Sequence, residues 1–254
     1  MDEEKRDESL VFGRNAVLAL FRAGTTVEKL YVQDGLKDGP IRTILREAKK
    51  TDTVVRFLPK ERLTEMAKDR AHQGVIALAG AGTYVEMDEL FRIAEERGEP
   101  PFFFLLDEVQ DPHNLGAILR TAHVAGAHGI ILPKVRSALL TPAAVKASAG
   151  AASFVPVVKT GNLVQTIEEL KKRGLWFVCG DMSGTSMYEL DLTGPMVLVL
   201  GNEGNGVSRL VKEHCDYAAA IPMHGELGSL NVSVACGVLG YEIVRQRRLK
   251  NEWK

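Results

Sequence analysis

Asn114 and Arg120 lie in the first of three stretches whose residue types could carry out chemistry, DPHNLGAILRTA at residues 111–122. An amide and a guanidinium can both donate hydrogen bonds to a ligand. Gly116, between them, would let another backbone or a ligand approach closely. Asn114 also stands where a helix N-cap is expected, and Arg120 could simply lie in solvent on the same helix. Position alone therefore leaves a structural and a functional interpretation open for both residues.

A glycine-rich turn forms the second stretch, LGNEGNGVSRL at residues 200–210. Its closely spaced glycines predict backbone N–H groups that are free to bind an anion or an adenosine. Val207 stands where a P-loop requires lysine, so the turn lacks the cation needed for ATP or GTP hydrolysis. The spacing G-x-x-G-x-G and the late position in the chain disfavour a dinucleotide-binding dehydrogenase. Glu203 would repel a phosphate unless an arginine or a ligand hydroxyl or amine satisfies it.

The third stretch is IPMHGELGSLNVSVACGVLGYEIVRQRR, residues 221–248, where Ser229 and Asn231 present a hydroxyl and an amide at the start of a predicted long helix. The basic end of this helix suits the helix dipole before it suits RNA. Small residues would permit close packing against a partner chain, although an ordinary core helix explains the apolar stripe equally well. The small residues are Ala235, Gly237 and Gly240, and the stripe is Val232, Ala235, Leu239 and Ile243.

The elements that must position these stretches form an α/β pattern after Pro101. The run FFFLLDEV is too apolar for a half-exposed strand and predicts a central strand buried on both faces. A helix and the strand GIILP follow it, which indicates a βαβ unit, a parallel sheet and a ligand crevice near the carboxyl ends of the strands. We expect further strands at residues 155–158, 175–180, 196–201 and 218–223, and helices near 162–173, 207–214 and 231–248.

A second, smaller α/β unit precedes this one. The pattern predicts helices at residues 11–23 and 41–50 and strands at 29–33, 54–58 and 74–79. Turn formers, an acidic amphipathic helix and a Pro pair follow, which places a domain boundary there. We therefore expect a first domain at residues 8–82, a linker with the acidic helix at 83–100, and a second domain at 101–254.

Composition narrows the classes of protein. In 254 residues, 45% of them hydrophobic, no apolar run is long enough for a membrane span, and the charged N-terminus does not resemble a signal peptide, so a cytoplasmic protein is expected. The cysteines form no CxxC pair and the histidines no HExxH pattern, so no metal site is expected. The net charge of −1 reflects residues 83–99, which hold two basic and six acidic side chains. RNA binding by the remainder stays possible, although a mixed, solvated surface explains the charges too.

Together the three stretches resemble the three motifs of the SpoU/TrmH family of RNA 2′-O-ribose methyltransferases, in the SPOUT superfamily. DPHNLGAILRTA matches the first motif, LGNEGNG the second and IPMHGELGSLNVSVA the third, in the same order. The segments GRNAVLALFRAG and HQGVIALA are similar to the RNA-binding domain of the branch that methylates a guanosine of large-subunit (23S) ribosomal RNA. The resemblance covers nearly the whole chain.

This resemblance implies a fold, a methyl donor and an assembly. The implied fold is an α/β SPOUT domain with a deep trefoil knot, preceded by a small α/β, ribosomal-protein-like RNA-binding domain. A homodimer is implied, with its active site near the subunit interface. The implied cofactor is S-adenosylmethionine, held largely through backbone groups of Gly201, Ile221 and Leu230. The catalytic neighbourhood carried over from the family consists of Asn114, Arg120, Glu203, Ser229 and Asn231.

The implied reaction needs a proton to leave the ribose 2′-hydroxyl, which holds it tightly at neutral pH. The family's counterpart of Arg120 is proposed as the base, yet a guanidinium is normally always protonated. Either a substrate phosphate assists it, or Arg120 positions that phosphate while another group takes the proton. We expect Asn114 to hold Arg120, Ser229 with Asn231 to orient donor and ribose, and Glu203 to fix the turn or Arg120.

Arg14, His72 and Gln73 are candidate RNA contacts in the first domain, because loops with amide and imidazole groups often read single-stranded RNA. The N-terminal similarity favours ribosomal RNA as the substrate. Two alternatives stay open: a methyltransferase acting on transfer RNA, and a non-catalytic relative that only binds ribosomal RNA. Binding of S-adenosylmethionine would separate the second alternative from an enzyme.

Overall fold

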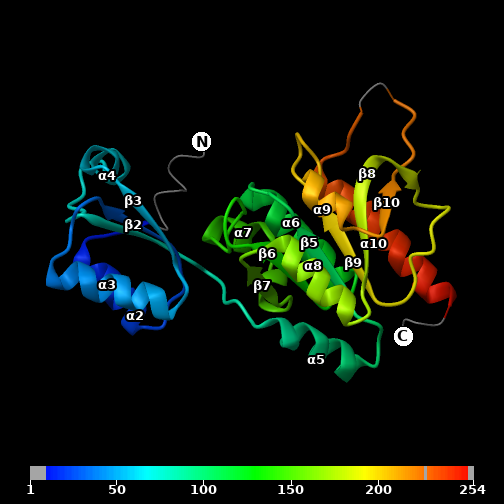
Figure 1. The fold of residues 1–254 in the computed structure, drawn as a ribbon, viewed down its shortest axis with the longest axis horizontal. Coiled ribbons are helices and arrows are strands. Elements are labelled where there is room, and N and C mark those ends of the chain that lie inside the picture. The colour runs from blue at the N-terminus through cyan, green and yellow to red at the C-terminus, as the bar shows by residue number, and fades with distance from the viewer. Residues whose placement is uncertain (1–9, 226–227, 251–254) are drawn as a thin grey trace. The chain divides into compact units, whose positions relative to one another are not determined.

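The structure, a computed structural model, describes residues 10–225 and 228–250. The chain divides into two compact units (Figure 1). The first contains the residues up to Thr83 with Leu139–Ala143, and the second contains Tyr84–Ala138 and Ala144–Lys254. Residues 8 and 9 of the expected first domain, residues 226–227 of the third stretch and residues 251–254 lie outside the described residues.

The first unit is a mixed sheet with helices on both faces. Its strands lie in the order β1-β4-β2-β3, with β2 and β3 parallel and the other pairs antiparallel. Val17 of α2 and Ile41 and Ile44 of α3 pack on one face, while Leu63 of α4 packs on the other. In chain order the elements are β1 (Leu10–Phe12), α2 (Arg14–Arg22), β2 (Val27–Gln33), α3 (Gly39–Lys50), β3 (Val54–Leu58), α4 (Lys60–Ala67) and β4 (Val75–Ala79).

The helix predicted at residues 11–23 is wrong at its start, because α2 begins only at Arg14. The preceding Leu10–Phe12 forms β1, which pairs antiparallel with β4 and sets Phe12 opposite Ile76. Gly13 then turns the chain from strand into helix with a φ of 87°, a left-handed conformation that favours glycine. An edge strand of three residues is too short to show a period in the sequence.

The second unit places a parallel sheet between helices. Its strands lie in the order β10-β8-β9-β5-β6-β7 and every neighbouring pair is parallel, which confirms the predicted sheet. The elements are α5 (Met87–Arg97), β5 (Phe102–Leu106), α6 (Pro112–Val124), β6 (Gly129–Pro133), the 3-10 turn Ala151–Ser153, β7 (Val157–Thr160), α8 (Leu163–Lys172), β8 (Trp176–Ser186), β9 (Met196–Leu200), α9 (Arg209–Glu213), β10 (Tyr217–Ala220) and α10 (Val232–Leu249). The short helix α7 (Pro142–Ala147) belongs to this unit from Ala144 onward.

The strand β5 is buried along its whole length, which confirms the predicted central strand. Phe103 and Leu105 pack in a cluster with Ile167 of α8, on one face of the sheet. Phe104 lies on the other face, where a Cβ at Gly240 of α10 would come within 3.3 Å of its ring. Because apolar helices cover both faces, an unbroken apolar run is what this strand requires.

The acidic helix α5 belongs to the second unit. Its Leu90 is fully buried in the same cluster as Phe103, and a Cβ on Gly129 of β6 would lie 2.5 Å from the Leu90 side chain. Much of the segment 83–100 is therefore part of a packed core. Among the described residues no helix combines the length and the apolar character that a membrane span requires. The trefoil knot implied by the family resemblance stays a prediction.

Parallel pairing brings the first two chemical stretches to one edge of this sheet. β5 and β9 run in register, so that Leu106 and Leu200 are opposite each other at their carboxyl ends. The backbone N–H of Asp107 donates to the carbonyl of Leu200 across a distance of 2.8 Å. The loops that follow these two strands therefore start side by side, where ligands bind in open α/β sheets.

Candidate functional site

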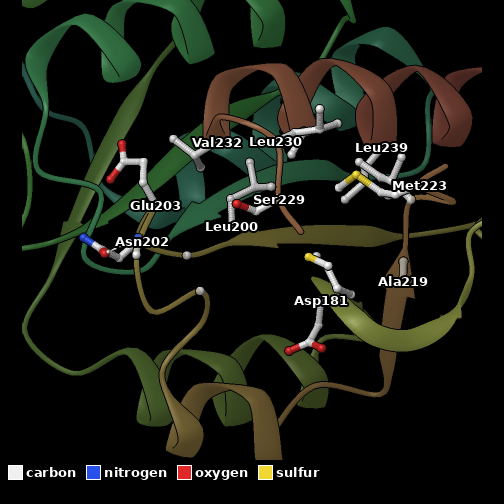
Figure 2. A pocket seen from close by; sticks show the side chains of 17 residues that line it. Asp181, Leu200, Asn202, Glu203, Ala219, Met223, Ser229, Leu230, Val232 and Leu239 are labelled. Atoms are coloured by element: carbon white, nitrogen blue, oxygen red, sulfur yellow. Dashed lines mark hydrogen bonds between the residues drawn. The ribbon is translucent and has the colours of Figure 1, made fainter. Parts of the chain in front are cut away.

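A cavity of about 300 Å³ lies at this carboxyl edge. Its walls come from the end of β9, from β8 and β10, and from the start of α10 (Figure 2). The lining residues are 180–182, 200–204, 206, 219, 221, 223, 229, 230, 232, 235 and 239. A volume of this size with mostly apolar walls and a few polar groups is typical of a small-molecule site.

The three residues expected to contact the methyl donor all line this cavity. Gly201, Ile221 and Leu230 come from the second and third stretches, and Glu203 and Ser229 join them. Figure 2 shows Ser229 and Leu230 on the α10 side of the cavity, above the end of β9 at Leu200. Two segments that are separate in the sequence thus line the same cavity.

The glycine-rich turn is closed by its own backbone. Asn202 and Gly206 exchange hydrogen bonds, 2.9 Å from the Asn202 N–H to the Gly206 carbonyl and 2.8 Å in the reverse direction. The Asn202 side-chain oxygen accepts from the N–H of Gly204 at 2.8 Å and from that of Asn205 at 3.3 Å. The prediction of free backbone N–H groups is therefore wrong for these four residues, because each donates within the turn. A Cβ on Gly201 would lie 2.0 Å from the Gly206 carbonyl carbon, because the returning backbone crosses at that point. Glycine at position 201 is therefore a steric requirement of the turn.

Asp107 holds this turn from the neighbouring strand, a role that the sequence analysis missed. Its side chain is 4% exposed, and its Oδ2 accepts from the backbone N–H of Ser208 at 2.7 Å. Asn202 adds a second link, since its amide donates to the carbonyl of Glu108 at 3.2 Å. The available signal was the charged residue that directly follows the apolar run FFFLL.

Replacing Asp107 with alanine is expected to loosen the turn, because the Ser208 N–H would lose its acceptor at a cost of roughly 1–3 kcal/mol. Affinity for a ligand of the cavity should fall about tenfold, measured by calorimetry, in step with that cost. Asp38→Ala is the matched control, since Asp38 also accepts from a backbone N–H, that of Ile41, but in the first unit. Equal loss of affinity in both variants would contradict the role given to Asp107.

Asn114 connects all three stretches. Its side-chain nitrogen donates to Glu203 Oε1, and its oxygen accepts from the Asn231 amide at 3.1 Å. Asn114 is 9% exposed, so these bonds are largely shielded from water. Partners 89 and 117 positions away in the sequence meet here.

The N-cap of α6 differs from the expected residue, Asn114, whereas the N-cap of α10 is the residue at the predicted start of that helix. Asp111, and not Asn114, is the N-cap of α6, and its side chain accepts from the N–H of His113 at 2.9 Å. Asn114 therefore lies in the first turn of α6, where its side chain is available for Glu203. Asn231 does cap α10, because its oxygen accepts from the N–H of Ser233 at 2.9 Å.

Arg120 is exposed on α6 and makes no hydrogen bond or ion pair with any residue that the structure describes. The expectation that Asn114 holds Arg120 is not met, because Asn114 is bonded to Glu203 and Asn231. Residues six positions apart lie about 120° apart around a helix, so their side chains do not meet. The guanidinium is left available for a ligand.

Two glycines in these helices pack against this chain's own backbone or core. A Cβ on Gly116 would lie 2.6 Å from the carbonyl oxygen of Ala144, so α7 is what approaches closely. Gly240 faces Phe104 of the sheet and gives no room to a partner chain. Val232, Leu239 and Ile243 are buried, so the apolar stripe of α10 is a core stripe. Gly237 meets nothing within 4 Å and remains open.

In the first unit, Arg14, at the start of α2, contacts the loop that contains His72 and Gln73. Arg14 donates to the Gln73 carbonyl at 3.0 Å and to Asp38 at 2.8 Å. His72 Nδ1 accepts from the N–H of Gly74 at 3.0 Å. These contacts give these residues a structural role, and contact with RNA stays a prediction. In the described part of the chain, no group of three His, Cys, Asp or Glu residues could hold a metal ion.

Residues 101–241 match the model of the SpoU rRNA Methylase family, which is more than half of the chain. The chain belongs to the SpoU rRNA Methylase family. Residues 10–85 of this SpoU-family chain match a second model, described as RNA 2'-O ribose methyltransferase substrate binding. The matched regions contain the first two stretches, residues 221–241 of the third stretch, and Arg14, His72 and Gln73.

Named relatives support the same assignment. The chain is 43% identical to YacO of Bacillus subtilis, a protein assigned to the TrmH family of tRNA/rRNA methyltransferases, over 93% of this chain and 95% of that one. It is 41% identical to the 23S rRNA (guanosine-2'-O-)-methyltransferase RlmB of Neisseria meningitidis, over 95% and 97% of the two chains. The crystal structure of the SpoU methyltransferase AviRb from Streptomyces viridochromogenes, in complex with the cofactor AdoMet, aligns with a TM-score of 0.60 and 27% identity over 94% and 90% of the chains.

The SpoU-family chain is therefore an S-adenosylmethionine-dependent RNA methyltransferase. The residues of the cavity fit this donor. Apolar side chains such as Leu200, Leu230 and Leu239 can cover an adenine. Among the residues that the structure describes, the charged side chains that line the cavity are the carboxylates of Asp181 and Glu203, which suit a ligand carrying a sulfonium.

Proposed function

We propose that this protein methylates the 2′-hydroxyl of a guanosine in large-subunit (23S) ribosomal RNA, in the cytoplasm. Similarity to RlmB over 95% of the chain supports the substrate class, and the substrate-binding model at residues 10–85 supports the ribose as target. The observation that carries the proposal is the bonding of Asn114 to both Glu203 and Asn231 beside the cavity. Polar groups from all three motifs are bonded to one another next to the cavity, which supports a shared role toward donor and ribose.

In the proposed mechanism the cavity holds the donor through backbone groups of Gly201, Ile221 and Leu230. When bound, S-adenosylmethionine supplies the electrophilic methyl group. Asn114 keeps Asn231 and Glu203 in place, and Ser229 with Asn231 orients the ribose against the donor. These side chains hold the methyl donor and the ribose in a fixed relative orientation, so that the two need not meet by random collision.

Arg120 neutralises a substrate phosphate next to the target ribose. Its guanidinium is exposed and unengaged among the described residues, and arginine matches phosphate geometry with two parallel hydrogen bonds. A protonated guanidinium cannot accept the 2′-hydroxyl proton, so the proton passes to another group. The phosphate oxygen that Arg120 holds is our candidate for the acceptor.

We further propose that the enzyme is a homodimer with Arg120 at the interface. Large apolar side chains are exposed around α6 and α10, among them Val124 at 58%, Phe154 at 69% and Tyr241 at 49%. The Tyr241 hydroxyl donates to the Val124 carbonyl at 3.3 Å, and Phe154 stacks on His123, so these side chains form one patch. Arg120 precedes Val124 by one helical turn. An exposed apolar patch of this kind marks a protein–protein interface.

Sedimentation should therefore give about twice the chain mass of 27.8 kDa for the wild type. Phe154→Asp should shift the protein toward the monomer, because it sets a charge in the patch without disturbing the core. Trp176→Asp, at another exposed aromatic residue, is the control and should stay dimeric. A monomeric wild type would contradict the dimer.

The substrate class is tested by offering a labelled methyl donor with purified large-subunit ribosomal RNA and, separately, with transfer RNA. We expect label in the ribosomal RNA. Label in transfer RNA alone would move the substrate to that class. Binding of the donor without label in either RNA would favour a non-catalytic relative.

A further inference from the structure

The charged residues that line the cavity are all acidic among the residues that the structure describes. Asp181 and Glu203 line it, and no lysine, arginine or histidine does so among the described residues. S-adenosylmethionine carries a net positive charge at neutral pH, because its sulfonium adds to an ammonium and a carboxylate. Its product, S-adenosylhomocysteine, has a neutral thioether and no net charge. A negative wall therefore interacts differently with the two molecules.

Asp181 is fixed in place by three hydrogen bonds. Its Oδ1 accepts from the backbone N–H of Ser183 at 2.8 Å and from the Ser183 hydroxyl at 2.6 Å. Its Oδ2 accepts from Lys212 Nζ at 2.6 Å. Burial alone raises the pKa of Asp181, but the hydrogen bonds from Lys212 and Ser183 outweigh it and hold the pKa below its ordinary value. The carboxylate is therefore ionised at neutral pH.

The ion pair between Asp181 and Lys212 contributes only its anionic residue to the lining of the cavity. Asp181 is one of the lining residues, whereas Lys212, on α9, is not. Figure 2 shows Asp181 on the opposite side of the cavity from Ser229 and Leu230, with its carboxylate pointing away from these two residues. Because both charges are fixed, the field at the cavity exists before any ligand binds.

We propose that Asp181 is a specificity-determining residue that favours the cationic methyl donor over its demethylated product. The inference rests on the proposal that this cavity is the donor site. Neutralising Asp181 should weaken binding of the sulfonium form more than that of the thioether form. In the wild type the same difference helps the product to leave once its charge is lost.

The test is the ratio of the dissociation constants of S-adenosylhomocysteine and S-adenosylmethionine, measured by calorimetry on the full chain. Asp181→Asn should lower this ratio about fivefold, the size expected for one charge in a partly hydrated pocket. Lys212→Gln should raise it, because the carboxylate loses its opposing cation. Asp181→Glu keeps the charge and should keep the ratio.

Asp191 offers a matched control in the same unit. Its Oδ1 accepts from the N–H of Thr193 at 3.1 Å and from the Thr193 hydroxyl at 2.5 Å, and Lys250 lies 3.1 Å from its Oδ2. This arrangement repeats that of Asp181, Ser183 and Lys212 away from the cavity lining. Asp191→Asn should therefore leave the ratio unchanged.

A purely structural role for Asp181 would weaken both ligands equally. A ratio left unchanged by Asp181→Asn and Lys212→Gln, or moved in the same direction by both, overturns the inference. Gly201→Ala distinguishes a wrong inference about Asp181 from a wrong placement of the donor in this cavity. If Gly201→Ala binds both ligands normally, the placement of the donor is wrong and the inference falls with it. If Gly201→Ala binds neither and the ratio stays constant in the other variants, only the inference falls.

Discussion

Replacing Arg120 with alanine is expected to slow methyl transfer by about 10³-fold while leaving the affinity for S-adenosylmethionine within about twofold of wild type. Arg120 is exposed on α6 and does not line the donor cavity. The substitution therefore breaks no hydrogen bond or ion pair with any described residue. Loss of the guanidinium should therefore weaken the interaction with the RNA phosphate and leave donor binding unchanged. Single-turnover transfer of a labelled methyl group measures the first effect, and calorimetry measures the second.

Arg209→Ala is the control for Arg120→Ala. Arg209 is 86% exposed on α9, and its one ion-pair partner among the described residues is Glu213, one turn away. Its removal therefore tests the loss of a surface cation near the glycine-rich turn. Its methyl transfer rate should stay near that of the wild type. Donor affinity that falls as steeply as the transfer rate in Arg120→Ala would contradict the division between donor binding and catalysis.

Alanine at position 201 is expected to reduce the affinity for S-adenosylmethionine by about 100-fold or more, the second large effect. The added Cβ would lie 2.0 Å from the carbonyl carbon of Gly206 and 2.1 Å from the nitrogen of Val207, both backbone atoms. The turn must therefore move, and with it the wall that Gly201 and Glu203 contribute to the cavity. Calorimetry and the rise in Tm on adding donor measure the loss, because a ligand that binds only the folded state stabilises it.

Gly204→Ala provides the control within the same turn. There the nearest atom to an added Cβ is the side-chain oxygen of Asn202 at 3.4 Å, an ordinary contact. Donor affinity should change by less than about threefold. Full donor affinity in Gly201→Ala would show that the turn is not part of the donor site.

The sequence alone was sufficient for the parallel sheet of the second unit and for most of its elements, but not for the order of its strands. The apolar run at Phe102–Leu106 predicted a strand buried on both faces, and the glycine-rich turn after Leu200 predicted a binding loop, because each pattern reflects a local requirement. The short strand at Leu10–Phe12 was read as helix, since three residues show no period and their pairing with β4 is distant in the sequence.

The hydrogen-bond network of the site could not be predicted from the spacing of residues in the sequence. Asn114 finds Glu203 and Asn231 at separations of 89 and 117 residues, and no local pattern encodes such partners. The sequence named all three residues through the family resemblance but linked Asn114 to Arg120. Asp107 was missed because its role depends on the backbone N–H of Ser208, a group that every non-proline residue carries.

The central claim is that the donor's methyl group is delivered to a ribose 2′-oxygen. The measurement that tests it most directly is mass spectrometry of the nucleosides from large-subunit ribosomal RNA after incubation with isotopically labelled S-adenosylmethionine and the wild-type enzyme. The account predicts labelled 2′-O-methylguanosine, formed about 10³-fold more slowly with Arg120→Ala. Label on a base, with unmodified ribose, would contradict it.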